Sequence, residues 1–350
     1  MSIAPFTVSF QDPERSTKVP SILKEYGVAV ITDVFTPDAC DTYMSGMVEG
    51  VQKISPQLSI ETYPKLKQTW TDRNIMPQVR KGLHQHGYSF LGWPVRGSEE
   101  VSTIFKEVYS DLRGHPVTEL VTSLDAINVR PPIPPFAQDT GDWAHVDQTK
   151  SADPFACVQG QVVLTNTTAG FRCSPKSHLV HEDILKHFGK SNAPGNFFKY
   201  QPHQYQDIQQ MVASAGGMWQ IPVIAPKGSM ILWFSATTHS AKLADPLNLK
   251  DYDPDDKWKH WRGVVYCCQR PKSEVDADHL KRLQYAYENN MTTNHWGDKI
   301  FKKPRYGVKV DNYAAHITRY TKTPKLIYSI PNTRPTLTAH EQSLIGLSAS

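Results

Sequence analysis

The chain lacks the features that mark several common protein classes. No stretch of about 18 apolar residues occurs, so the sequence predicts no membrane-spanning helix. The five cysteines are odd in number and form no C-x-x-C pair, which argues against a disulfide framework or a zinc ribbon and favours a reducing compartment. The N-terminus has no basic segment leading into an apolar one, so we expect no signal peptide and a cytoplasmic protein. The net charge of only +4 gives no argument by itself for a nucleic-acid partner.

Short apolar segments separated by turn-forming residues are frequent, with 26 prolines in the chain. They predict strands at 28–32, 126–130, 158–165, 221–225, 229–235 and 263–269. Helical patterns occur near 37–51, 101–124 (with a break around Gly114), 182–188 and 274–289, and 190–220 is predicted to be a long insertion. Many short strands with few helices between them favour an antiparallel sandwich, mainly β with α additions.

Three residues form a candidate metal site. His145 and Asp147 are two apart on a predicted strand, so their side chains point to one face. His239 follows the apolar strand at 229–235. Two imidazoles and one carboxylate can occupy one face of an octahedral iron(II) and leave three positions open. An isolated H-x-D is more often a salt-bridged pair on a surface strand, so it is the ordered set of three that favours a metal.

Arg262 lies at the start of the next predicted strand, 263–269, and follows the three candidate metal ligands in the sequence. Its fixed charge and planar fork are suited to holding a carboxylate. A histidine–aspartate–histidine metal site followed by an arginine on an adjacent strand predicts an oxygenase that uses iron and a 2-oxo acid.

These motifs resemble the iron(II)/2-oxoglutarate oxygenases of the phytanoyl-CoA dioxygenase superfamily, which includes ectoine hydroxylase. The resemblance covers roughly residues 20–270. It rests on KEYGVAVITDVFTPDACD (24–41), INVRPP (127–132), DWAHVD (142–147), VVLTNTTAGFRCSPKSH (162–178), GSMILWFSATTH (228–239) and WRGVVYCC (261–268).

The resemblance implies a double-stranded β-helix, a jelly roll with helices packed on one side. It implies one catalytic domain over 1–350, with an oxygenase core at 20–270 and a C-terminal extension at 271–350. Fe(II) would be held by His145, Asp147 and His239, with 2-oxoglutarate and O₂ as co-substrates.

The resemblance also implies roles for further residues. Arg262 would pair with the distal carboxylate of 2-oxoglutarate, and Asn128 would contact the same molecule. Trp143 and Arg172 would line the substrate pocket. Because Asp147 is present, where halogenating relatives have a small residue, hydroxylation with release of succinate is expected.

Some segments depart from the family pattern. Lys176 stands where the family's P-G-S-H turn has glycine. The long loop at 240–260 leaves Lys250 as an alternative partner for the carboxylate. The segment 190–220 and everything after 270 have no clear counterpart, so the substrate is open.

A small-molecule substrate is favoured, but two alternatives stand. Residues 296–335 contain nine Lys or Arg against two Asp, interleaved with tyrosines, a composition that could dock nucleic acid or another acidic partner. The chain would then modify a macromolecule. We favour a segment that wraps the core, because Ile300 and Ile317 offer apolar anchors. The second alternative is a catalytically silent jelly-roll binding module.

Overall fold

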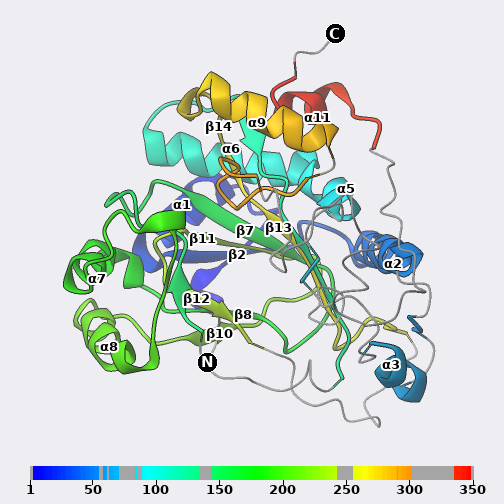
Figure 1. Cartoon of the computed structure of the whole chain (residues 1–350), viewed down its shortest axis with the longest axis horizontal. Helices are drawn as coiled ribbons and strands as arrows, with labels where there is room; N and C mark the ends of the chain where they lie inside the picture. Colours follow the sequence, from blue (N-terminus) through cyan, green and yellow to red (C-terminus); the bar gives the residue numbers. More distant parts are fainter. Residues whose placement is uncertain are drawn as a thin grey trace.

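The computed structural model describes nine ranges of the chain: 3–54, 58–60, 63–70, 83–84, 89–133, 143–242, 255–289, 291–300 and 335–347. Within them the chain is mixed α/β, with three sheets of which none is closed (Figure 1). Almost all strand pairs are antiparallel, as the short apolar segments predict; the pair β1–β2 is parallel. The double-stranded β-helix itself stays a prediction.

Two larger sheets and one small sheet make up the strand arrangement. The seven-stranded sheet runs in the order β1 (Thr7–Ser9), β2 (Val28–Thr32), β11 (Met230–Phe234), β7 (Val158–Val163), β13 (Arg262–Cys267), β5 (Ile127–Arg130) and β3 (Leu83–His84). The five-stranded sheet runs in the order β10 (Ile221–Val223), β8 (Phe171–Cys173), β12 (His239–Ala241), β6 (His145–Val146) and β9 (Phe198–Lys199). The strands β4 (Leu120–Thr122) and β14 (Gln269–Pro271) pair separately.

Helices form a larger part of the chain than the sequence pattern predicts, so "mainly β" is too narrow a description. The α-helices described are α1 (Arg15–Tyr26), α2 (Pro37–Ile54), α3 (Tyr63–Trp70), α5 (Trp93–Arg96), α6 (Glu99–Arg113), α7 (His181–His187), α8 (Tyr205–Ser214), α9 (Ala277–Glu288) and α11 (Ala339–Leu344). The break predicted around Gly114 is where α6 ends, at Arg113, because Gly114 adopts a positive φ of 69°. The residues after it form β4 instead of the predicted continuation of the helix. The insertion at 190–220 contains a strand and a helix that its sequence did not predict.

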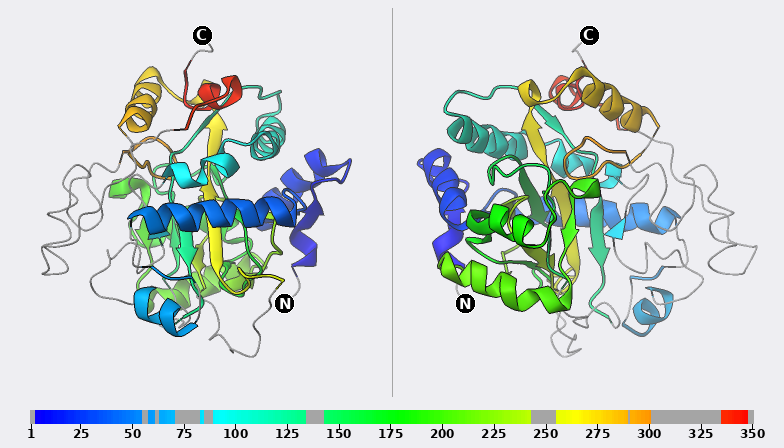
Figure 2. Two further views of the ribbon diagram at one scale, coloured as in Figure 1. Left: turned by 90° about the vertical axis from the view of Figure 1, so that its right-hand side faces the viewer. Right: turned by 60° about the vertical axis from the view of Figure 1, so that its left-hand side comes forward.

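The seven-stranded sheet separates two apolar layers. Alternate residues of β2 show the division: Ala29 and Ile31 pack against α1, α2 and α6, whereas Val28 and Val30 pack against the five-stranded sheet. The helices therefore cover one face of the larger sheet, and the other face looks toward the smaller sheet (Figures 1 and 2). A site between the two sheets receives side chains from both.

Other helices close the outer side of the smaller sheet and one end of the molecule. Ala144, Val146 and Phe198 pack against α7 and α8. Helices α9 and α11 share an apolar cluster with α5 and β4. The division into a core at 20–270 and an extension stays a prediction, and most of the basic region, 301–334, lies outside the described residues. No helix in the described part of the chain is long and apolar enough to cross a membrane.

Lys176 lies in the turn between β8 and the short helix at 177–180, and its φ of 67° lies in the left-handed region. The left-handed region costs a residue with a side chain about 1–2 kcal/mol of strain, which glycine avoids. Part of that gain is lost because glycine has greater conformational freedom in the unfolded chain. We expect Lys176→Gly to raise the free energy of unfolding by about 0.5–1 kcal/mol, measured by urea denaturation. A loss of stability would instead show that the contact of the lysine Nζ with the Tyr26 ring, at 5.5 Å, outweighs the strain.

Candidate metal centre

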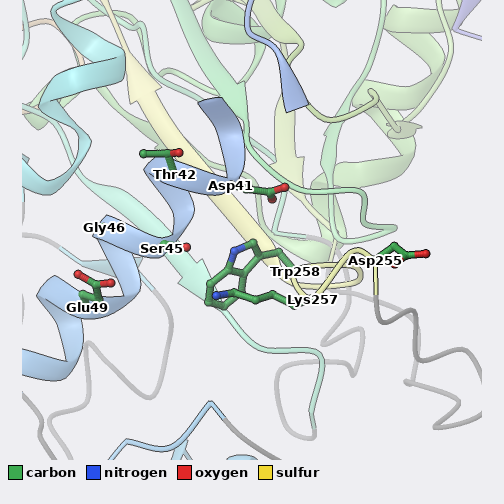
Figure 3. A pocket seen from close by; sticks show the side chains of 8 residues that line it. All are labelled: Asp41, Thr42, Ser45, Gly46, Glu49, Asp255, Lys257 and Trp258. Carbon is green, nitrogen blue, oxygen red and sulfur yellow. The ribbon is translucent and has the colours of Figure 1, made fainter. Parts of the chain in front are cut away.

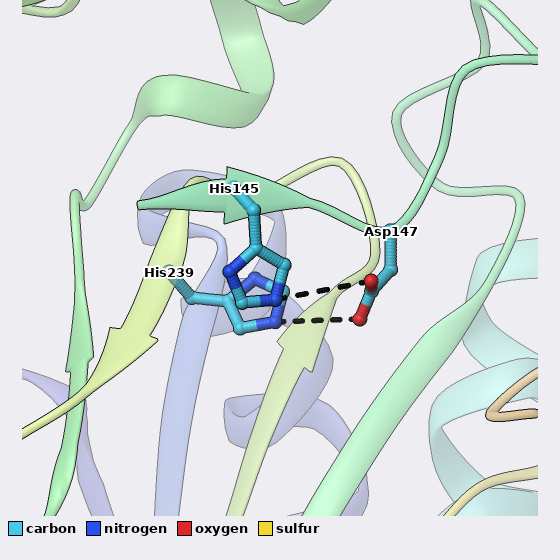
Figure 4. A group of neighbouring side chains, drawn as sticks. All are labelled: His145, Asp147 and His239. Atoms are coloured by element: carbon cyan, nitrogen blue, oxygen red, sulfur yellow. Dashed lines mark ion pairs between the residues drawn. The ribbon is translucent and has the colours of Figure 1, made fainter. Parts of the chain in front are cut away.

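Two neighbouring strands of the five-stranded sheet bring the two histidines together. His145 on β6 lies directly opposite His239 on β12 in the antiparallel register. His239 does not follow β11 as a loop residue; the chain turns after β11, crosses to the smaller sheet, and His239 begins its new strand. Asp147 comes just after β6, where its backbone N–H donates to the carbonyl of Ser235 at 3.0 Å. Figure 4 shows the three side chains converging.

The three side chains form a compact group that could hold a metal ion. One ligand atom from each of His145, Asp147 and His239 lies within 4.8 Å of the others, and all three residues are buried. Asp147 Oδ1 lies 3.8 Å from His145 Nε2, and Asp147 Oδ2 lies 3.4 Å from His239 Nε2. The imidazole centroids are 4.2 Å apart. Two nitrogens and one carboxylate at this spacing suit a divalent transition metal.

Backbone carbonyls set the orientation of both imidazoles. His145 Nδ1 donates to the carbonyl of Trp143 at 3.2 Å, and His239 Nδ1 donates to the carbonyl of Thr237 at 2.8 Å. A carbonyl only accepts, so the proton is on Nδ1 and the Nε2 lone pair of each ring is left to face the group. Burial, and next the neighbouring His239, lowers the pKa of His145 to about 3. The ring is therefore neutral, as a metal ligand must be.

Asp147 is held as a carboxylate by its surroundings. Burial alone would raise the pKa of Asp147, but the protonated imidazole of His295, whose Nε2 lies 3.6 Å from Asp147 Oδ2, helps to hold the pKa of this carboxyl below its usual range. Gln159 Nε2 donates to Asp147 Oδ2 at 3.1 Å, and Trp296 Nε1 donates to the Asp147 carbonyl at 2.8 Å. These contacts fix the carboxylate in place before any metal arrives.

The contact from Gln159 leads to a testable expectation about metal affinity. Loss of a hydrogen bond that orients a metal ligand typically weakens metal binding about 10–100-fold. We expect Gln159→Leu to weaken iron(II) binding by a factor in that range, measured by competition with a chelator. The matched control is Gln161→Leu on the same face of β7, which has no hydrogen bond to Asp147 and should leave iron affinity unchanged. Equal affinity in the two variants would show that Gln159 does not orient the ligand.

His295 is a third imidazole at this centre that the sequence did not reveal. Its Nδ1 forms an ion pair with Asp125, and its Nε2 lies 3.6 Å from Asp147 Oδ2. Burial alone would lower the pKa of His295, but Asp125 and then Asp147 raise it to about 10. The C-terminal part of the chain thus contributes directly to the site.

A cavity of about 390 Å³ opens beside His145 and His239, and we call it the central cavity. Its lining residues are Asp125, Ala126, Trp143, His145, Gln161, Phe171, Phe197, Lys199, Trp233, His239, Ser240, Ala241, Arg262, Tyr266 and His295. A second hollow of about 620 Å³ lies between α2 and the segment at 255–258 (Figure 3). It is larger, but it contains none of the predicted site residues and no metal-binding group among the residues described.

Arg262 lines the central cavity from the seven-stranded sheet. Only 2% of its surface is exposed, and no carboxylate pairs with it among the described residues; its Nη1 donates to the Gly170 carbonyl at 3.4 Å. Arg130 lies directly opposite on β5, and burial together with Arg262 lowers the pKa of Arg130 to about 9. A buried guanidinium beside a second one is costly unless an anion joins it, so this end of the cavity fits a carboxylate.

Of the other predicted residues, Trp143 lines the central cavity, Asn128 lies buried on the neighbouring strand β5, and Arg172 faces away. Asn128 is buried on the same face of β5 as Arg130, and its Oδ1 has no hydrogen-bond partner in the part of the chain described. Trp143 lines the central cavity and stacks on His145, with centroids 4.6 Å apart. Arg172 lies between two residues of the inner apolar cluster on β8, so alternation turns it to the opposite face, and it does not line the cavity. Its predicted contact with substrate stays a prediction, and Lys250 lies outside the described residues.

Comparisons with known proteins show the fold and leave the function open. No protein family's sequence profile and no curated protein matches the chain. The hypothetical protein JW0805 from Escherichia coli matches with a TM-score of 0.59 and 14% identity, over 98% of this chain and 85% of that one. GlcNAc Inducible Gene 2 (GIG2, DUF1479) from Candida albicans matches with a TM-score of 0.53 and 14% identity, over 98% and 79%. The non-heme alpha ketoglutarate dependent epimerase SnoN matches at a TM-score of 0.42 and 11% identity, over 74% and 84%, a likeness too weak to support an inference.

Proposed function

We propose that the protein is an iron(II)/2-oxoglutarate-dependent dioxygenase with a double-stranded β-helix core that hydroxylates a small molecule. The observation that carries this proposal is the pairing of two features in one cavity: three converging side chains that could hold a metal ion, and a buried arginine with no carboxylate partner among the described residues. The overall reaction would convert substrate, O₂ and 2-oxoglutarate into hydroxylated substrate, succinate and CO₂.

Each residue has a defined task in this proposal. His145 and His239 would bind iron through Nε2, and Asp147 through its carboxylate. When bound, the iron would supply the oxidising chemistry, with 2-oxoglutarate as the source of two electrons. Arg262 would hold the distal carboxylate of 2-oxoglutarate by a bidentate contact.

The aromatic residues that line the central cavity would orient His239 and exclude water from the site. Phe171 and Trp233 pack together with centroids 4.4 Å apart, and each contacts the His239 ring, at 5.7 and 5.4 Å. These rings hold His239 in its orientation and keep water from the wall of the cavity.

The proposal is tested by measuring succinate formed from 2-oxoglutarate under air, with and without iron(II). We expect slow iron-dependent succinate release without substrate and faster release with a matching substrate from a metabolite library. Iron-loaded protein that forms no succinate with any of these compounds would point instead to a silent binding module.

A further inference from the structure

The segment 190–220, which has no counterpart in the related family, supplies one side of the central cavity through β9. Lys199 lies opposite His145 in the antiparallel register of β9 and β6, so both side chains point to the same face. Alternation places Phe197 on that face too, whereas Phe198 packs outward with α7 and α8. Both Phe197 and Lys199 line the cavity.

Two aromatic rings at the cavity expose apolar surface that the protein does not cover. Phe197 and Trp143 are each 39% exposed, although both are large and apolar. Both rings lie against His145, with centroid distances of 5.1 Å for Phe197 and 4.6 Å for Trp143. Neighbouring exposed rings in a concave site are typical of a surface that binds an apolar ligand.

Lys199 adds a positive charge that no acidic group described at the cavity neutralises. It is exposed and forms no ion pair with any described residue. The acidic groups nearby are already engaged: Asp125 pairs with His295, and Asp147 faces the histidines. If Arg262 holds the co-substrate, as proposed above, Lys199 is still free, among the described residues that line the cavity, to pair with a second anion.

We propose that the mouth of the central cavity binds a substrate with a flat apolar body and an anionic group, the body lying against Trp143 and Phe197 and the anion pairing with Lys199. This inference rests on the proposed function, because it assigns Arg262 to 2-oxoglutarate and Lys199 to the substrate.

The test uses 2-naphthoate as the anionic probe and 2-naphthamide as its neutral equivalent. Binding is measured by calorimetry to the metal-free protein and to the protein loaded with iron(II) and 2-oxoglutarate without oxygen. We expect naphthoate to bind at least about ten times more tightly than the amide, as a charge-assisted contact implies. Lys199→Met should remove that preference. Phe197→Ala should weaken both probes about three- to tenfold.

Two matched controls separate the site from general surface effects. Lys186→Met removes an exposed lysine on α7, and Leu179→Ala removes an exposed apolar side chain; neither lines the central cavity. Both should bind the probes as the wild type does.

Three results would overturn the inference: no binding of naphthoate at millimolar concentration, equal affinity for the two probes, or an increase in the 2-oxoglutarate requirement with Lys199→Met. The last result would mean that Lys199 holds the co-substrate. Failure of the proposed function would show separately, as absence of iron or 2-oxoglutarate binding in the same samples.

Discussion

Alanine at His145, Asp147 or His239 is expected to abolish iron(II) binding and all iron-dependent turnover. Each substitution leaves two ligands from a set whose atoms lie within 4.8 Å of one another. Two ligands cannot hold both the metal and a chelating co-substrate in place. The loss should exceed the 10–100-fold effect typical of a residue that only orients a ligand. Iron content after gel filtration and succinate formation are the two measurements.

A histidine elsewhere provides the control for these variants. His187 on α7 is half exposed, pairs with Asp207 and lies outside the central cavity. His187→Ala should keep full iron content and activity. Any one of the three ligand variants that retains wild-type iron content and turnover would remove that residue from the metal centre.

Arg262→Ala is expected to raise the 2-oxoglutarate requirement by roughly 10–100-fold, since a charge-assisted bidentate contact contributes about 1.5–3 kcal/mol. Iron affinity should stay nearly unchanged, because Arg262 is not one of the three residues that could ligate metal. The 2-oxoglutarate requirement of Arg262→Lys should lie between those of the wild type and Arg262→Ala, because lysine keeps the charge but cannot form the planar fork. Steady-state kinetics with varied 2-oxoglutarate measures all three proteins.

The exposed Arg282 on α9 gives a matched control, and Arg282→Ala should not change the requirement. If Arg262→Ala leaves the requirement unchanged, another cation holds the distal carboxylate. Arg130 is then the first residue to test, because it lies directly opposite Arg262 on the neighbouring strand.

The grouping of His145, Asp147 and His239 could be predicted because their arrangement depends on local rules. The alternation of a strand places His145 and Asp147 close together, and the order of the strands suggests that His239 joins them. The end of α1 at Gly27 follows the same kind of local rule, because glycine is the residue that most readily adopts a positive φ, here 75°. Local sequence also contained the signal that Arg172 faces away from the cavity: it lies between two apolar residues on a short strand.

The remaining site residues depend on contacts between segments far apart in the sequence. His295 reaches Asp125 and Asp147 only because the chain after α9 returns to the cavity. Lys199 faces the site because β9 pairs with β6, and a two-residue strand carries too little pattern to predict its register. Arg130 becomes notable only once its register opposite Arg262 is known. Such pairings are decided by tertiary packing, which the sequence pattern alone does not specify.

The most direct measurement is an oxygen-free titration of the iron(II)-loaded protein with 2-oxoglutarate, followed by visible absorption. We predict one iron per chain and a charge-transfer band that saturates at one 2-oxoglutarate per chain. The band should be absent from His239→Ala and should need higher 2-oxoglutarate concentrations in Arg262→Ala. A wild-type protein that binds iron but develops no band at saturating 2-oxoglutarate would contradict the assignment of this cavity to both iron and co-substrate.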